Sequence, residues 1–192
     1  MKKPAITAVD IHPVLAERWS PRSLDKTATI SSEDMTALLE AARWAPSANN
    51  AQPWRFIIAR RNDENFDKIK ATLTGFNQIW SPNAAAYIVI VANMKNEDGT
   101  ERTISLFDCG LAAAHLSVEA HHRGFVVHQM AGFDHPGLAT SFGLPESQAP
   151  VIIMAIGKQA PAEALGEGPV LERETAPRER IALADLVIGG SL

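Results

Sequence analysis

The sequence of 192 residues predicts a layered domain of helices and strands, of the α/β or α+β class. Apolar runs rich in β-branched or aromatic residues predict strands, and helical segments of unequal length separate them. No internal repeat and no linker divides the chain, so a single domain over residues 1–192 is expected. Hydrophobic periodicity alone does not decide between a mixed and a parallel sheet.

The N-terminal part of the chain predicts two helices. The first covers residues 7–18 and is ended or restarted by Pro21. In the second, Ser31 and Asp34 resemble a capping box, and an apolar helical face follows them. This second helix must stop at Pro46, and the polar segment after it is expected to form an ordered loop.

Strands and helices follow one another as far as Gly157. Strands are expected at 54–59, 85–92, 125–130 and 151–156, and helices at 64–73, 103–123 and 136–142. The longest helix carries small residues that would let another helix approach closely, with Leu106 and Gly110 on its predicted apolar side. Gly124 is expected to cap its C-terminal end.

The chain beyond Gly157 has a different composition. Residues 158–180 are rich in Pro, Gly and Glu, which predicts an extended arm, and 183–188 could form a last short element. Structureless segments of this length are uncommon in a compact monomer. A partner subunit around which the arm wraps would supply the missing burial.

Composition and charge exclude several classes of protein. With 18 Lys and Arg against 22 Asp and Glu the net charge is −4, which argues against non-specific binding to nucleic acid. The single cysteine, Cys109, rules out an intramolecular disulfide framework and is expected to be buried. The longest apolar run, 84–92, is too short for a membrane helix. We therefore expect a soluble, cytoplasmic protein.

A small basic group stands out in this acidic chain. Arg18 and Arg22 are four residues apart with Ser20 between them, so two guanidinium groups and a hydroxyl could converge on a phosphate. On spacing alone, the better-supported alternative is a solvated basic helix end.

Two further segments could bind a ligand. Residues 46–54 offer hydroxyl and amide groups between two prolines and could recognise a pyrimidine-like ring edge, although a helix-to-strand connector is about as plausible. In 129–134, Gly132 could let backbone N–H groups approach a ligand and Met130 could pack on a flat ring, although a glycine after a strand is usually a turn.

The sequence offers little for a metal ion or for nucleophilic catalysis. None of the six histidines has a carboxylate or cysteine companion at the spacing of a metal site, so no metal is expected. No phosphate-binding glycine motif and no nucleophile elbow occurs in the chain.

Taken in order along nearly the whole chain, these segments resemble the nitroreductase family of flavin mononucleotide (FMN) enzymes. Any one of them is weak evidence, but the APS-x-x-N-x-QPW block is fairly specific and the ordered series is strong. The matching segments are Arg18-Trp19-Ser20-Pro21-Arg22, 45–54, Asn77-x-x-Trp80, Asp108-x-Gly110, 130–134, 144–146 and 155–157.

The resemblance implies an α+β fold with a mostly antiparallel central sheet flanked by helices. It also implies an intertwined homodimer with FMN sites at the interface. In such a dimer, residues 158–192 would be the arm exchanged with the partner subunit.

The resemblance also assigns cofactor-binding roles to individual residues. Arg18, Ser20 and Arg22 would hold the FMN phosphate and ribityl chain, and one or both of Arg178 and Arg180 would complete the phosphate site. Asn77 would read the ring edge, with backbone N–H groups from Ala131 and Gly132 near the ring. The same flavin would be reached from the other subunit by Pro46, Ser47, Ala48 and Asn50.

Two positions depart from the family's pattern. Trp19 stands where many members have a second arginine, which removes one charge near the flavin. Ala131 stands where well-known members have glutamate, so a backbone contact could remain there while the side-chain contact is lost.

The implied reaction is a ping-pong transfer of reducing equivalents from NADH or NADPH to a small electron-poor acceptor such as a nitroaromatic or a quinone. The chemistry belongs to the cofactor, so no catalytic side chain is nominated. Other readings keep the fold: aldehyde or enone reduction, flavin fragmentation, or a non-catalytic flavin-binding redox module. A protein without any flavin is the remaining alternative.

Overall fold

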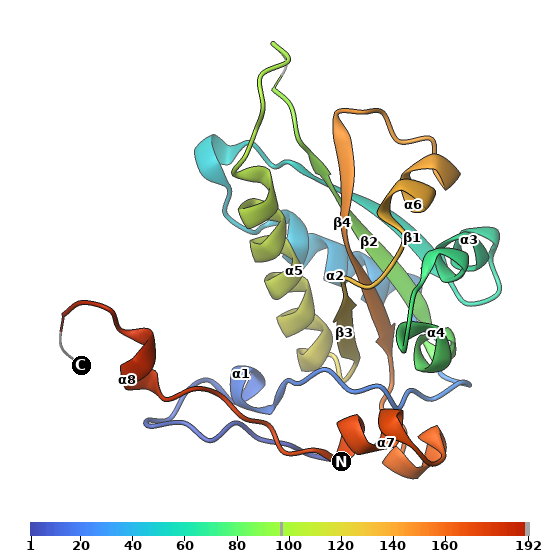
Figure 1. The fold of residues 1–192 in the computed structure, drawn as a ribbon, viewed down its shortest axis with the longest axis vertical. Helices are drawn as coiled ribbons and strands as arrows, with labels where there is room; N and C mark the ends of the chain where they lie inside the picture. The colour runs from blue at the N-terminus through green and yellow to red at the C-terminus, as the bar shows by residue number, and fades with distance from the viewer. Residues whose placement is uncertain (97, 191–192) are drawn as a thin grey trace.

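A four-stranded sheet forms the centre of the computed structural model, which describes residues 1–96 and 98–190 (Figure 1). Its strands are β1 (Trp54–Arg60), β2 (Ala86–Asn93), β3 (Val126–Met130) and β4 (Gln148–Gly157). Their order is β1-β2-β4-β3, and every neighbouring pair is antiparallel. The four predicted strands and the α+β class are confirmed, and the sheet is neither mixed nor parallel.

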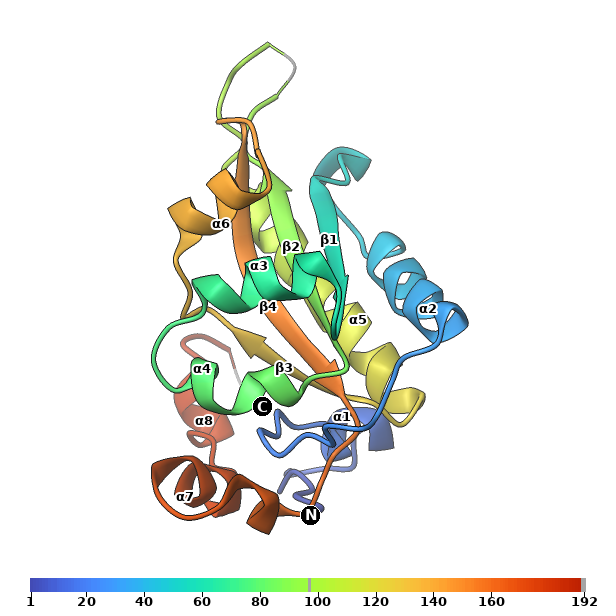
Figure 2. The same ribbon diagram turned by 90° about the vertical axis from the view of Figure 1, so that its right-hand side faces the viewer.

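Helices cover both faces of this sheet (Figure 2). On one face lie α2 (Ser32–Arg43) and α5 (Ser105–His122), and on the other α3 (Glu64–Thr72) and α6 (His135–Ser141). Strand β2 is central and almost wholly buried, because alternate side chains enter one core cluster or the other: Ile88 and Ile90 face α2 and α5, whereas Val89 and Val91 pack on the α3 side.

Strand β4 begins at Gln148, three residues before the start expected at 151. Its first residues pair with the end of β2, where the Gln148 side-chain amide donates to Asn93 at 2.9 Å. The register shifts between Ile90 and Val91, opposite Pro150. Proline is uncommon within strands and a bulge interrupts the regular pairing, so the sequence pattern did not show that the strand begins before Val151.

Both long helices begin or end as predicted. The Ser31 hydroxyl accepts the N–H of Asp34 at 3.0 Å, which caps α2. Gly124 adopts a φ of +72° and its N–H donates to the His121 carbonyl at 2.9 Å, which closes α5. The predicted apolar side of α5 is wrong at Leu106 and Gly110, which are exposed, because the buried face is centred on other positions.

The helix expected at 7–18 is wrong over its first half. Only α1 (Pro13–Glu17) is helical, and His12 caps it with an extended backbone (ψ 131°). A residue before proline is pushed out of the helical region, so the helix cannot extend back through Pro13. The short helix α4 (Asn77–Trp80) was not expected from the sequence.

The C-terminal segment is not extended throughout. It contains the short helix η3 (Ala162–Leu165), then α7 (Pro169–Thr175) and α8 (Leu183–Leu186). Its first part packs on the N-terminal region of its own chain, where Gln159 bridges Leu24 and the Ala160 N–H donates to the Ser23 carbonyl at 3.0 Å. Beyond α7 the chain runs beside the N-terminal segment and projects from the body with α8 at its end (Figure 1).

None of the helices within the described ranges is long and apolar enough to span a bilayer.

Candidate functional site

The segment 18–22 leaves α1 and crosses the end of the sheet. Arg18 is the residue after the last turn of α1, and its guanidinium donates to the Ser20 hydroxyl at 3.4 Å. Two residues after the segment, Leu24 bridges Gln159, just beyond the end of β4. Arg18, Ser20 and Arg22 are half-buried, so their polar groups lie at the surface on a fixed backbone.

The C-terminal cations meet this segment. The Arg178 guanidinium donates to the carbonyls of Lys3 at 2.5 Å and Ala16 at 3.0 Å. Burial lowers the pKa of Arg18, and the nearby charges of Arg178 and Arg180 lower it further. We call Lys3, Arg18, Arg22, Arg178 and Arg180 the cationic cluster.

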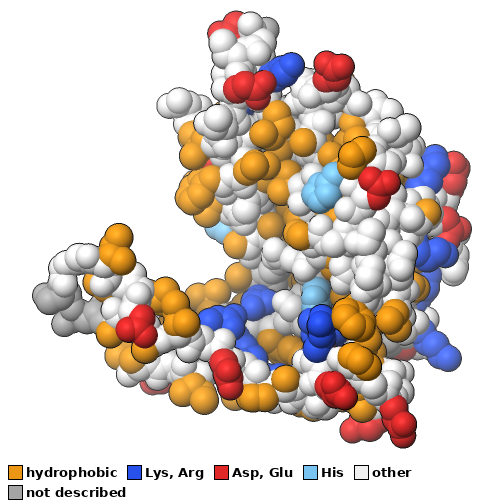
Figure 3. All heavy atoms as spheres, in the orientation of Figure 1, with side chains coloured by type: hydrophobic (Ala, Val, Ile, Leu, Met, Phe, Trp, Pro, Cys, Tyr) orange, Lys and Arg blue, Asp and Glu red, His pale blue; other side chains and the backbone are white. Residues whose placement is uncertain are grey.

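The charged groups of the cationic cluster form no ion pairs with acidic side chains. Within residues 1–96 and 98–190, none of their ammonium or guanidinium nitrogens lies within 4 Å of a carboxylate oxygen. Lysine and arginine side chains gather at the base of the hollow between the projecting C-terminal segment and the body (Figure 3). Such a concentration of positive charge suits a multiply charged anion.

A second group lies at the end of β3. The Asn77 side-chain amide donates to the Gly132 carbonyl at 3.2 Å, and a Cβ on Gly132 would stand 3.0 Å from that amide nitrogen. The Thr74 N–H donates to the same carbonyl at 3.1 Å. Ala131 and Gly132 are exposed, and in the described part of the chain the Gly132 N–H donates to no protein acceptor. This backbone can approach a ligand closely because residue 132 has no side chain.

Two of the predicted residues are placed differently from the rest. Met130 is only 2% exposed and packs in the core beneath the sheet, so little of its side chain is available to a ligand. Trp19 is half-buried, and its ring faces the Lys3 ammonium at 4.5 Å from the ring centroid.

The loop 46–52 lies elsewhere in the molecule. It precedes β1, at one edge of the sheet, whereas Gly132 follows β3 at the other edge. Pro46, Ala48 and Asn50 are exposed and Ser47 is half-buried. The loop leads into Trp54, which is level with Ala149 near the start of β4. The segment 18–22 instead leads to Leu24, beyond the end of β4. One chain therefore does not bring the loop together with the cationic cluster.

The backbone of this loop is strained and held in place. Asn49, Asn50 and Gln52 have φ values of +54°, +54° and +47°, which non-glycine residues adopt only when their surroundings fix them. The Ser47 hydroxyl accepts the Gln52 N–H at 3.0 Å. Both carboxylate oxygens of Asp108, which is 1% exposed, lie 3.3 Å from the Ala48 N–H.

Several residues around the cationic cluster were not singled out by their sequence patterns. His128, on β3, lies within 3.1 Å of the Pro21 carbonyl, so its Nδ1 must carry the proton and donate. Burial, together with the nearby Arg22 charge, lowers the pKa of His128 to about 4, which keeps this ring neutral at neutral pH. Glu174, on α7, is fully buried and accepts from the backbone of residues 22 and 23.

Cys109 is buried in α5, as predicted, and burial raises the pKa of its thiol to about 12. A thiol in this state is not a nucleophile at neutral pH.

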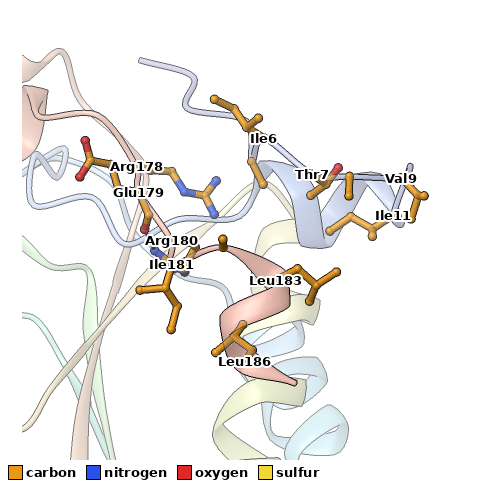
Figure 4. Close-up of a pocket in the computed structure, with 13 residues that line it drawn as sticks. Ile6, Thr7, Val9, Ile11, Arg178, Glu179, Arg180, Ile181, Leu183 and Leu186 are labelled. Atoms are coloured by element: carbon orange, nitrogen blue, oxygen red, sulfur yellow. Dashed lines mark hydrogen bonds between the residues drawn. The ribbon is translucent and has the colours of Figure 1, made fainter. Parts of the chain in front are cut away.

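An apolar groove adjoins the cationic cluster. It has a volume of about 720 Å³ and lies between the N-terminal segment 5–11 and the C-terminal segment 178–186. Ile6, Val9, Ile181, Leu183 and Leu186 line it, and Arg178 and Arg180 stand at one end (Figure 4). Ile6 is 98% exposed, so the apolar walls are not covered by their own chain.

Known proteins resemble this chain in sequence and in fold. The model of the nitroreductase family matches residues 15–158. YdgI of Bacillus subtilis (strain 168), named as an NAD(P)H nitroreductase, is 31% identical over 188 residues, covering 79% of this chain and 89% of YdgI. A protein of Lactiplantibacillus plantarum named CLA biosynthesis enone reductase is 24% identical over 188 residues. The match covers 79% of this chain and 86% of the reductase.

A solved structure described as an oxidoreductase containing FMN superimposes with a TM-score of 0.88. Its sequence is 29% identical, and the match covers 97% of this chain and 94% of that one. The family model spans most of the chain, and the sheet order, the cationic segment and the polar loop lie inside the matched region. The chain belongs to the nitroreductase family.

Proposed function

We propose that this chain is an FMN-dependent oxidoreductase that passes reducing equivalents from NADH or NADPH to a small electron-poor acceptor, such as a nitroaromatic or a quinone, by a ping-pong mechanism. The observation that carries the proposal is the cationic cluster, whose charged nitrogens form no ion pair with a carboxylate among the described residues, together with the exposed backbone of Gly132 after β3. The name of YdgI and the FMN in the structural relative point to the same donor and cofactor.

The residues present fit FMN. Its phosphate is a dianion at neutral pH, and Arg18, Arg22 and one of Arg178 or Arg180 can supply guanidinium contacts to it. Arg178 already gives donors to two backbone carbonyls, which leaves Arg180 the freer of the two. Asn77 and the Gly132 backbone offer donors for the edge of a flat ring.

When bound, FMN supplies the hydride and electron transfer. The protein's own groups orient the ligands and surround the ring with fixed donors and positive charge, which favour a ring that gains negative charge. No side chain at the site needs to act as a general acid or base in this proposal.

We further propose that the active form is a homodimer in which the loop 46–52 of one subunit completes the site of the other. Pro46, Ser47, Ala48 and Asn50 lie far from the cationic cluster of their own chain, so they can join it only from a second copy. The part of the C-terminal segment beyond Arg180, with α8, is the part we propose to be exchanged, since residues 159–160, Glu174 and Arg178 bond to their own chain.

The exposed surface of α5 supports this dimer. Phe107, Gly110 and Ala114 are exposed along one side of the helix, and a Cβ on Gly110 would meet no atom within 4 Å. Gly110 and Ala114 are small and allow a second helix to pack closely, and Phe107 offers it exposed apolar surface. Gly110→Leu should raise the intrinsic stability of the helix by about 0.5–1 kcal/mol and yet shift the protein from dimer to monomer. Sedimentation at several concentrations measures this shift, and a dimer of unchanged affinity would contradict the proposed interface.

The experiment that tests the activity uses purified protein with added FMN. Oxidation of NADH and of NADPH is followed with a nitroaromatic or a quinone as acceptor, and stopped-flow mixing separates reduction by the nicotinamide from reoxidation by the acceptor. A protein that oxidises neither nicotinamide with any electron-poor acceptor would refute the proposal.

The enone reductase among the relatives favours one second candidate, reduction of the carbon–carbon double bond of an enone. Analysis of the products formed from an enone and from a nitroaromatic under the same conditions distinguishes the two reactions.

We place the reaction in the cytoplasm, as the single buried cysteine and the nicotinamide donor suggest.

A further inference from the structure

Glu174 is a fully buried carboxylate that the proposed reaction does not use. It lies near the end of α7, with 0% of its surface exposed. Its two oxygens accept the backbone N–H groups of Arg22, at 2.7 Å, and Ser23, at 3.3 Å. Burying a carboxylate is costly unless hydrogen bonds satisfy it, so these two contacts fix the backbone of residues 22 and 23 firmly.

Other contacts hold the same short segment from different sides. His128 donates to the Pro21 carbonyl, and the Ser23 hydroxyl donates to the Pro161 carbonyl at 2.5 Å. Glu174 is the only carboxylate among these contacts within the described residues, and it binds the two N–H groups that follow Pro21. Glu174 therefore fixes the position of the Arg22 backbone, from which the guanidinium side chain extends.

Glu174 also contacts the N-terminal segment, through its main-chain carbonyl. The Lys3 ammonium donates to the main-chain carbonyls of Glu174 and, at 2.6 Å, of Ala176. Arg178 in turn donates to the Lys3 carbonyl. The buried carboxylate thus lies at the junction from which Lys3, Arg22 and Arg178 all extend.

The charge of Glu174 has a second consequence. Burial lowers the pKa of Lys3, the nearby Arg22 and Arg178 lower it further, and Glu174 opposes this change by attraction. Arg22 experiences the same attraction. A buried anion behind the cluster reduces the mutual repulsion of cations that all face one ligand.

We propose that Glu174 is a positioning residue for phosphate recognition: its carboxylate sets the Arg22 backbone and the surrounding cations in the geometry that binds the FMN phosphate. This inference rests on the proposed function. It concerns only the phosphate end of the cofactor, so it makes a prediction for FMN that it does not make for riboflavin, which has the same ring and no phosphate.

The test compares Glu174→Gln with the wild type and with Glu172→Gln. Glu172 lies in the same helix, is exposed, and its side chain accepts no hydrogen bond among the described residues, so it is a matched control for the lost charge. Dissociation constants of FMN and of riboflavin are measured by titration for each full-length protein. Loss of a negative charge alone should strengthen the binding of a dianion.

The positioning role predicts the opposite sign. Glutamine can accept one of the two N–H groups but presents an NH₂ group to the other, so the segment shifts. We expect Glu174→Gln to lower the preference for FMN over riboflavin by about 10-fold, the size expected when hydrogen bonds to a charged group are lost. Glu172→Gln should leave this preference unchanged or slightly raised.

Two results would overturn the inference: a higher preference in Glu174→Gln, or an unchanged one. Equal losses for FMN and riboflavin leave the preference unchanged and would mean a general structural role. If Glu174→Gln fails to fold, Glu174→Asp, whose shorter side chain cannot reach both N–H groups, is measured in the same way. Failure of the proposed function is seen separately, as a wild-type protein that does not prefer FMN to riboflavin.

Discussion

Each cofactor is proposed to contact two segments, one from each subunit, and each segment is held by a buried carboxylate that accepts backbone N–H hydrogen bonds. Glu174 holds residues 18–23, and Asp108 holds the loop 46–52. The first contact is short, at 2.7 Å to Arg22, and comes from the C-terminal segment. The second is long, at 3.3 Å to Ala48, and comes from α5.

The two segments differ in what they present. Residues 18–22 carry guanidinium groups on a backbone without positive φ values, whereas the loop 46–52 carries neutral amides and hydroxyls on a backbone with three positive φ values. Binding by the charged segment thus depends on the positions of the Cα atoms that carry its arginines. Binding by the neutral loop depends on the path of its backbone. The difference predicts that, in the proposed dimer, one subunit supplies the cations of each site and the other supplies a shaped loop of neutral hydrogen-bonding groups.

Arg22→Ala should have the largest effect on the binding of FMN. Loss of one charge-assisted contact is worth about 1.5–3 kcal/mol, or about 10–150-fold in affinity, with riboflavin nearly unaffected. Asn50→Ala, the matching change in the neutral loop, should cost about 0.5–1.5 kcal/mol for FMN and riboflavin alike. Titration of both ligands against both variants makes the comparison, and an Arg22→Ala protein with unchanged FMN affinity would contradict the phosphate assignment.

His128→Asn tests whether the anchoring of residues 18–22 makes the stability of the protein depend on pH. Among the described residues no histidine anchors the loop 46–52, so only the charged segment should show this dependence. The pKa of His128 is lowered by burial and by Arg22 from its usual 6.5 to about 4. Between these values the unfolded chain binds more protons than the folded one, so stability is complete above pH 6.5 and falls as the pH drops toward 4.

This loss should amount to about 1–3 kcal/mol for the wild type, since one unit of pKa corresponds to about 1.4 kcal/mol. The asparagine amide can still donate to the Pro21 carbonyl but does not titrate, so the variant should lose less stability over the same range. Urea unfolding at about pH 7 and about pH 4.5 measures both proteins. Parallel losses in the two would show that acidic side chains, and not this ring, govern the acid limit.

Local patterns in the sequence were sufficient for most of the sheet and for the two long helices. The unbroken apolar run of β2 and the Ser31–Asp34 cap depend on residues close together in the chain, so the rules for buried strands and for helix caps predicted them. The helix expected at 7–18 was wrong because the pattern of apolar residues continued past Pro13, where the backbone could not.

Glu174 shows why part of the site could not be predicted. In a segment rich in proline, glycine and glutamate it looked like one solvated charge among several, and its partner Arg22 lies 152 residues earlier. One local signal was present: Gly168 precedes Pro169, and a proline in the first turn is typical of a helix start. That signal predicts α7 but not the burial of its carboxylate, which depends on the N-terminal segment packing against it.

The candidate residues themselves came partly from spacing and partly from family resemblance. Spacing placed Arg18 and Arg22 together, whereas the nearness of Arg178 and Arg180 to them followed only from the resemblance. The structure does bring these guanidinium groups close enough for Arg178 and Arg180 to lower the pKa of Arg18, after burial. Their contact with FMN stays a prediction.

Asp108→Asn should weaken FMN binding less than Arg22→Ala and by no more than Asn50→Ala. Its carboxylate makes only long contacts with one N–H, and an asparagine carbonyl can still accept from Ala48, so we expect a loss of about 0.5–1.5 kcal/mol in FMN affinity. Because the loop 46–52 is proposed to contact the ring and not the phosphate, riboflavin should lose as much. A loss confined to FMN would contradict the division of labour between the two segments.

Mixed dimers of Asp108→Asn and Arg22→Ala then decide which subunit the loop serves. If the loop 46–52 reaches the partner's cofactor, the site that uses the intact Arg22 also receives an intact loop, and the other site carries both defects. Half of the sites in the purified mixed dimer should then bind FMN with wild-type affinity. If the loop serves its own chain, every site carries one defect, and no site with wild-type affinity should be found in a two-site titration.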